Sequence, residues 1–91
     1  MPNKKTSDKE LKPIGEVTHY YSGLGVAIVK FSKVVRVGET IRFKGATTDF
    51  EEKISSMQYN HKNIEAAKKN QQVGIKVSEK VREGDLVYPV E

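Results

Sequence analysis

The sequence predicts an all-β fold, a small closed barrel of six strands, and the prediction rests on two observations. Eleven valines and six isoleucines stand against three leucines. Such β-branched side chains favour strands, because they lose rotamer freedom in helices. Short alternating apolar segments are separated by turn residues about every ten positions. An open sheet of this size would leave two exposed edges, so the pattern favours closure into a barrel.

The length and composition indicate a single globular domain. The 91 residues suffice for one hydrophobic core and not for two. There is no cysteine, so neither a disulfide nor a thiolate zinc site can cross-link the chain, and hydrophobic packing must stabilise the fold. No apolar run approaches the roughly 20 residues that span a bilayer. The first residues lack the apolar stretch of a signal peptide, so we expect a cytoplasmic protein without membrane contact.

Residues 1–13 are predicted to form a disordered basic tail, and residues 14–91 the barrel domain. The tail has one large apolar residue, Leu11, which cannot bury enough surface to offset the entropy of ordering. Its four lysines against Asp8 and Glu10 give +2 of the net charge of +4. The remaining +2 is a modest bias that leaves nucleic acid open as a partner.

Six strands are predicted in order. They are residues 14–21, 24–31, 40–44, 50–59, 72–78 and 85–90. The second is apolar on both faces, which is typical of a central strand enclosed on both sides. In the fourth, Ile54 and Met57 are out of phase, which indicates a bulge between them. Residues 63–69 are predicted to form a helical turn, and Pro89 fits a terminal or edge position.

Two turns share a glycine followed by an acid directly before an apolar strand. They are Val37-Gly38-Glu39 and Glu83-Gly84-Asp85. Glycine supplies the positive φ of a tight turn, and the acid can accept backbone N–H groups there. This structural use of Glu39 and Asp85 is favoured over a catalytic one.

Six short motifs occur in one order between residues 14 and 90. They are Gly15-Glu16-Val17, Ser22-Gly23-Leu24-Gly25-Val26, Val35-Arg36-Val37-Gly38-Glu39-Thr40-Ile41, Ser56-Met57, Val73-Gly74-Ile75 and Arg82-Glu83-Gly84-Asp85-Leu86-Val87-Tyr88. Together they resemble the second, β-barrel domain of elongation factor Tu and related translational GTPases. The resemblance extends to small free-standing proteins called translation elongation factor-like.

The resemblance implies a barrel that helps to hold the aminoacylated end of transfer RNA, or that touches the ribosome. A related barrel also closes some peptidase-like RNA-modification proteins. The family often has a basic residue where Leu24 stands, and leucine cannot contact a phosphate. Asn70 stands at a family glycine, and asparagine tolerates the left-handed conformation. The sequence contains no Gly-x-x-x-x-Gly-Lys-Ser/Thr loop, which excludes GTP hydrolysis by this chain alone.

The candidate nucleic-acid site is a strip of basic residues beside two tyrosines. The basic residues are Lys30, Lys33, Arg36, Arg42 and Lys44. They fall on two consecutive predicted strands and their connection, so they lie close together if those strands pair. Tyr20, Tyr21 and Phe31 would supply a stacking surface for single-stranded RNA, although alternation lets only one of Tyr20 and Tyr21 face outward. The alternative is that these aromatic residues belong to the core.

Two functions follow, both without catalysis. The first is a binding module for RNA, transfer RNA or the ribosome in a translation-related role, acting through phosphate contacts. The second is a protein-docking barrel for a separately encoded partner, such as a translational GTPase or an RNA-modification protein. We expect no enzyme, because no nucleophile, base and orienting group can be assembled. His19 and His61 lack metal-ligand spacing, so no metal, cofactor or nucleotide is expected.

Overall fold

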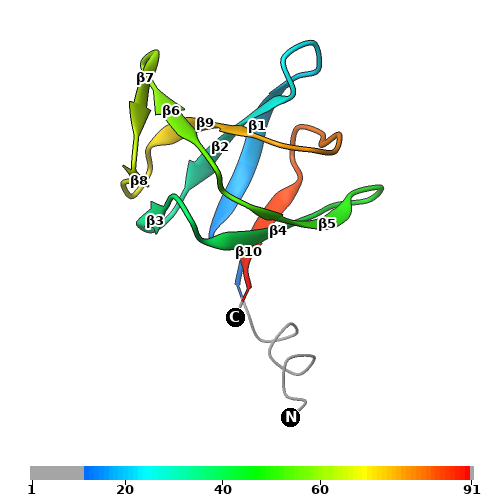
Figure 1. The fold of residues 1–91 in the computed structure, drawn as a ribbon. Helices are drawn as coiled ribbons and strands as arrows, with labels where there is room; N and C mark the ends of the chain where they lie inside the picture. Colours follow the sequence, from blue (N-terminus) through cyan, green and yellow to red (C-terminus); the bar gives the residue numbers. More distant parts are fainter. Residues whose placement is uncertain (1–11, 91) are drawn as a thin grey trace.

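The computed structural model describes residues 12–90, and the regular secondary structure of this part is all β, as predicted (Figure 1). The strands are β1 (Gly15–Tyr21), β2 (Val26–Phe31), β3 (Val35–Arg36), β4 (Thr40–Lys44), β5 (Asp49–Lys53), β6 (Met57–Tyr59), β7 (Lys62–Ile64), β8 (Ala66–Ala67), β9 (Gln72–Lys76) and β10 (Leu86–Pro89). The predicted disordered tail, residues 1–13, lies outside the described residues except for Lys12 and Pro13.

Eight of the described strands form one antiparallel sheet, in the order β5-β4-β10-β1-β2-β9-β6-β7, and β3 pairs with β8 in a small second sheet. Among these strands, β5 and β7 end the main sheet without pairing to each other. The main sheet is therefore a curled half-barrel, and the predicted closed barrel of six strands is wrong. The second predicted strand does lie in the centre, since β2 pairs with β1 and β9.

The strand count differs from the prediction because very short strands leave almost no periodicity in a sequence. The predicted strand 50–59 divides into β5 and β6, at the position where a bulge was expected. Residues 63–69, predicted as a helical turn, contribute to β7 and form β8. Their alanines and lysines favour a helix, but pairing with β6 and β3 overrides that local preference.

The connection between β5 and β6 makes the sheet curl. β5 is first and β6 seventh in the sheet order, yet only residues 54–56 separate them along the chain (Figure 1). A connection this short spans at most about 14 Å, so the two ends of the sheet must approach each other. The side chain of Ile54 is fully buried; its N–H donates to Glu39 O at 2.9 Å, and its carbonyl accepts from Gly38 N at 2.8 Å.

Apolar side chains fill the inside of the curl. On β2, Ala27, Val29 and Phe31 are fully buried and point inward. Val17 of β1 lies opposite Val29, and Ile75 of β9 lies opposite Ala27. Burial of each large side chain contributes about 1.5–3 kcal/mol. The core thus supplies the cohesion that a chain without cysteine cannot obtain from disulfides.

The two glycine-acid turns have the conformation that the sequence predicted. Gly38 has φ of 100° and Gly84 φ of 92°, both in the region that favours glycine. The acid that follows each glycine accepts the backbone N–H of the residue three positions earlier, Glu39 Oε2 at 3.0 Å and Asp85 Oδ2 at 2.9 Å. Asn70, with φ of 66°, is left-handed as expected.

Candidate functional site

The predicted basic strip is not assembled by this topology. Lys30 lies on β2, whereas Arg42 and Lys44 lie on β4. The strip required these strands to pair, but β1 and β10 lie between them. At the usual strand spacing this separates β2 from β4 by roughly 14 Å. Arg36 lies on β3 in the second sheet, and Lys33 lies in the link before it, so the basic residues spread over two sheets.

Acidic side chains alternate with the lysines along one row of the sheet. The cross-strand register places six residues in this row, in the order Asp49, Lys44, Leu86, Glu16, Lys30 and Gln72. Each lysine therefore has an acid as its immediate neighbour on an adjacent strand. An alternating row of this kind lacks the continuous positive potential that a phosphate backbone requires.

Arg42 is paired directly with an acidic side chain. Its Nε donates to Asp49 Oδ1 at 2.9 Å, and Glu51 of β5 lies opposite it. The hydrogen bond from Arg42 lowers the pKa of Asp49 below its ordinary value, with further contributions from the charges of Arg42 and Lys44. The cations of β4 thus face the acids of β5.

The two tyrosines divide between the core and the surface, as strand alternation predicted. Tyr20 is half-buried and packs against the core. Tyr21 is 47% exposed, and its ring packs against the His19 ring in a T-shaped arrangement with a centroid distance of 4.3 Å. His19 Nδ1 lies 3.0 Å from Glu83 Oε2. Tyr21 is thus the one tyrosine of the predicted pair that offers a surface, and it lies next to apolar residues.

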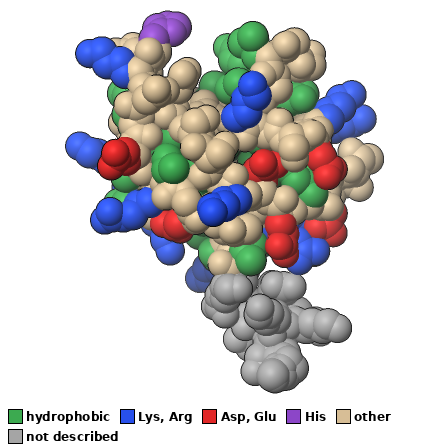
Figure 2. Space-filling model, in the orientation of Figure 1, with side chains coloured by type: hydrophobic (Ala, Val, Ile, Leu, Met, Phe, Trp, Pro, Cys, Tyr) green, Lys and Arg blue, Asp and Glu red, His purple; other side chains and the backbone are tan. Residues whose placement is uncertain are grey.

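The main surface feature is an outer apolar face formed by Tyr21, Leu24, Val26, Ile28 and Gly74. Val26 and Ile28 alternate with the buried residues of β2, so they point away from the core and remain half-exposed. Leu24, in the loop between β1 and β2, is 66% exposed. Hydrophobic side chains gather over this loop at the top of the molecule in Figure 2.

Gly74 completes the outer apolar face by leaving room for its neighbours. It lies opposite Ile28. A Cβ at this position would lie 3.3 Å from Val26 Cγ1 and 3.5 Å from Ile28 Cδ1. The two side chains therefore lie over bare glycine backbone. The sequence signal for this surface is the apolar pattern on both faces of β2, because a strand with that pattern was expected to be enclosed on both sides.

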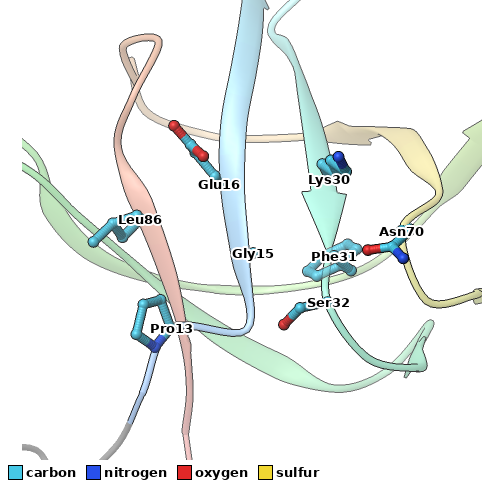
Figure 3. A pocket seen from close by; sticks show the side chains of 8 residues that line it. All are labelled: Pro13, Gly15, Glu16, Lys30, Phe31, Ser32, Asn70 and Leu86. Atoms are coloured by element: carbon cyan, nitrogen blue, oxygen red, sulfur yellow. The ribbon is translucent and has the colours of Figure 1, made fainter.

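A surface cavity lies at the other end of β1, around Gly15 (Figure 3). Its volume is about 290 Å³. Its lining residues are Pro13, Gly15, Glu16, Lys30, Phe31, Ser32, Asn70 and Leu86. Of these, the sequence predicted Lys30 as a phosphate-binding residue and Phe31 as a stacking residue, but the Phe31 side chain is fully buried in the core. The others come from four separate segments that only the fold brings together.

Within residues 12–90 no three His, Cys, Asp or Glu side chains come together as a metal site. The same part of the chain has no helix long and apolar enough to cross a membrane. His61 lies exposed in the turn between β6 and β7, with φ of 67°.

The sequence is similar to segments of proteases. An uncharacterized protease from Methanocaldococcus jannaschii is 45% identical over 76 residues, which cover 82% of this chain and 19% of that protein. A collagenase from Porphyromonas gingivalis is 35% identical over 77 residues, which cover 82% of this chain and 21% of the collagenase. The chain thus spans about a fifth of the length of these curated relatives. No family model matches it.

Solved structures show the same fold in a peptidase. The C-terminal domain of a putative U32 peptidase from Geobacillus thermoleovorans superposes with a TM-score of 0.81 at 21% identity, covering 90% of this chain and 94% of that domain. A selenomethionine variant of that domain gives 0.80 at 22% identity, covering 85% and 98%.

These comparisons correct the expected family and function. The expected relationship to the second domain of elongation factor Tu is wrong, because the relatives found by sequence are proteases. A translation-related role in binding RNA, transfer RNA or the ribosome is therefore wrong, and so is docking to a translational GTPase or an RNA-modification protein. The chain is similar to a segment of proteases and has the fold of the C-terminal domain of a U32 peptidase.

Proposed function

We propose that this chain is a non-catalytic accessory domain that docks onto the catalytic part of a U32-type peptidase. The observation that carries this proposal is the outer apolar face. Val26 and Ile28 point outward from the central strand and remain half-exposed, next to Tyr21 and Leu24 at 47% and 66% exposure. Neighbouring apolar side chains that remain accessible can form the centre of a contact with another protein, because the fully buried core of an interface is more apolar than its rim.

The size of the outer apolar face favours a larger partner over a second copy of the chain. Three adjacent strands cover about 14 Å, and five residues of strand about 17 Å, which gives a footprint of roughly 240 Å². A stable protein–protein interface buries about 800 Å² on each partner. The face alone is too small for a stable dimer. It suits the centre of a contact between neighbouring domains, where shape and polar groups at the rim supply the rest.

The relatives favour a peptidase as that partner. The proteases that resemble this chain devote about four-fifths of their length to other sequence. A domain of this fold in a U32 peptidase has that other sequence as its neighbour. The side chain of Lys76, which lies opposite Val26, has no ion-pair or hydrogen-bond partner among the described residues. A docking surface with apolar groups and one carboxylate opposite Lys76 would complement this face.

A direct role in peptide cleavage is not supported by the described residues. His19 has Glu83 at its Nδ1, at 3.0 Å, which leaves Nε2 as the nitrogen that could act as a base, but no hydroxyl of the described residues is hydrogen-bonded to this ring. The hydroxyl of Thr18, its neighbour, donates to Gln72 Oε1 at 3.1 Å. A nucleophile needs a base within hydrogen-bond reach, and neither group has that arrangement.

The test is binding to the M. jannaschii protease from which the matching segment has been removed. We expect this chain to bind the shortened protease, and to bind the full-length protease much less, because the protease's own segment occupies the surface. Ile28→Lys should weaken binding at least about tenfold, since a charge would be buried at the interface. Val34→Lys is the matched control, because Val34 is 49% exposed in the link between β2 and β3.

Two results would contradict the proposal. One is equal affinity for the shortened and the full-length protease. The other is equal loss of affinity in the Ile28→Lys and Val34→Lys variants. If the shortened protease does not fold, the same substitutions are made in a full-length chimera that carries residues 14–90 of this chain. The proposal then predicts that Ile28→Lys lowers the chimera's melting temperature more than Val34→Lys does.

A further inference from the structure

The cavity around Gly15 gathers four polar side chains of different chemistry. Glu16 is a carboxylate, Lys30 an ammonium group, Ser32 a hydroxyl and Asn70 an amide. None of these side chains has a hydrogen bond or an ion pair with another residue in the described part of the chain. The apolar side chains of the lining that remain accessible are Pro13 and Leu86. Convergent unpartnered polar groups on an apolar wall are typical of a small-molecule site.

Glu16 and Lys30 lie on neighbouring strands, but their side chains do not form an ion pair. Glu16 and Lys30 are direct cross-strand neighbours. Opposite charges in that position commonly form an ion pair, but no ion pair joins them here. Figure 3 shows Glu16 and Lys30 on opposite sides of the Gly15 position, with Ser32 and Asn70 toward the Lys30 side. The cavity therefore has a negative end and a positive end.

We infer that this cavity binds a small zwitterion, a free amino acid or a dipeptide. The ligand's α-ammonium group donates to the carboxylate of Glu16. Its α-carboxylate accepts from the ammonium group of Lys30, with the Ser32 hydroxyl and the Asn70 amide as further donors. No covalent step is involved.

The size of the cavity limits the ligand. Pockets for drug-sized molecules occupy about 300–1,000 Å³, and this cavity, at about 290 Å³, lies at the lower end. One or two amino-acid residues fit, and a longer peptide would extend into solvent. Hydrolysis of peptide bonds yields such ligands, but the inference rests on the cavity alone and does not depend on the proposed function.

The test is a titration of the isotope-labelled chain with the dipeptide Gly-Leu, followed by amide chemical shifts. We expect shifts centred on Gly15, Glu16 and Phe31, with a Kd on the order of 1 mM for so small a ligand. N-acetyl-Gly-Leu lacks the ammonium group and Gly-Leu amide lacks the carboxylate. Each should bind at least about tenfold more weakly, because a charged hydrogen bond is lost.

Variants separate the cavity from general surface charge. Glu16→Gln and Lys30→Met should each weaken binding of Gly-Leu at least about tenfold. Glu79→Gln and Lys62→Met change exposed charges outside the cavity and should leave the affinity unchanged. The inference is overturned if Gly-Leu causes no shifts, if the blocked dipeptides bind as well as Gly-Leu, or if the control variants lose affinity as the cavity variants do. Unchanged spectra away from the cavity would show that each variant is folded.

Discussion

At the scale of single residues, Gly15 lies against core side chains that leave no room for a Cβ atom. An added Cβ would lie 2.9 Å from Phe31 Cδ1 and 3.0 Å from Val29 Cγ1, and both of those side chains are fully buried. We expect Gly15→Ala to lower the free energy of unfolding by about 1–3 kcal/mol, the usual cost of overpacking. Urea denaturation measures this. Gly23→Ala is the control, because a Cβ there meets nothing within 4 Å, and equal losses in the two variants would refute the packing account.

Asp49 makes the stability depend on pH. The Arg42 hydrogen bond lowers its pKa in the folded state, so its contribution is fully present above the ordinary value of 3.8 and is lost as the pH falls through the lower folded-state value. We expect Asp49→Asn to destabilise the chain at pH 7 by less than about 1 kcal/mol, since the pair is half-exposed. Unfolding curves at several pH values should show this difference disappearing in acid. A difference that persists below the folded-state pKa would contradict the assignment.

Several single-residue features were predictable from the sequence because they depend on local chemistry. The positive φ of Gly38 and Gly84 and the left-handed Asn70 follow from what those residues permit. The position of the cavity was not predictable, because Glu16, Lys30 and Asn70 meet only after distant strands pair.

At the scale of elements, β2 presents two different faces, and neighbouring residues should respond differently to one substitution. Val29 is fully buried in the core, so Val29→Thr places a hydroxyl without a partner among apolar groups and should cost about 1–3 kcal/mol. Ile28 is half-exposed on the outer apolar face, so Ile28→Thr should cost less than about 1 kcal/mol. Thermal or urea unfolding of both variants tests this. Equal costs would mean that Ile28 is a core residue and that the outer apolar face is not available for docking.

Most strands were predicted, but the order in which they pair was not. Alternation located β1, β2, β4, β9 and β10, because each is long enough to show a period of two. The basic strip failed because it assumed that Lys30 and Arg42 lie on paired strands, whereas β1 and β10 lie between β2 and β4. Sequential strands often pair, but a long-range pairing that buries more apolar surface can replace that arrangement.

At the scale of the whole molecule, the closure of the curl depends on the short link at Ile54. This side chain is fully buried where the chain passes from β5, at one end of the sheet, to β6, which is next to the other end. We expect Ile54→Ala to cost about 2–5 kcal/mol, the usual range for a large-to-small change in a core. Val34→Ala, at a position 49% exposed, should cost less than about 0.5 kcal/mol. A small loss at Ile54 would indicate that the ends of the sheet are held together by other contacts.

The fold carries less information about function than the resemblance suggested. Ordered glycine turns and apolar strands are what a small curled sheet requires, so unrelated proteins that share this architecture share those motifs as well. The relatives identified by sequence are proteases, and the solved domain of this fold comes from a U32 peptidase. The function must therefore be argued from the surface, where the outer apolar face and the cavity around Gly15 are the two distinctive features.

The most direct test of the central claim is hydrogen–deuterium exchange of this chain, alone and with the shortened M. jannaschii protease. We expect the partner to slow exchange over the outer apolar face, in β1, the loop containing Leu24, β2 and β9, and to leave exchange in β4 and β5 unchanged. Protection confined to β4 and β5, or no protection in a complex that demonstrably forms, would contradict it.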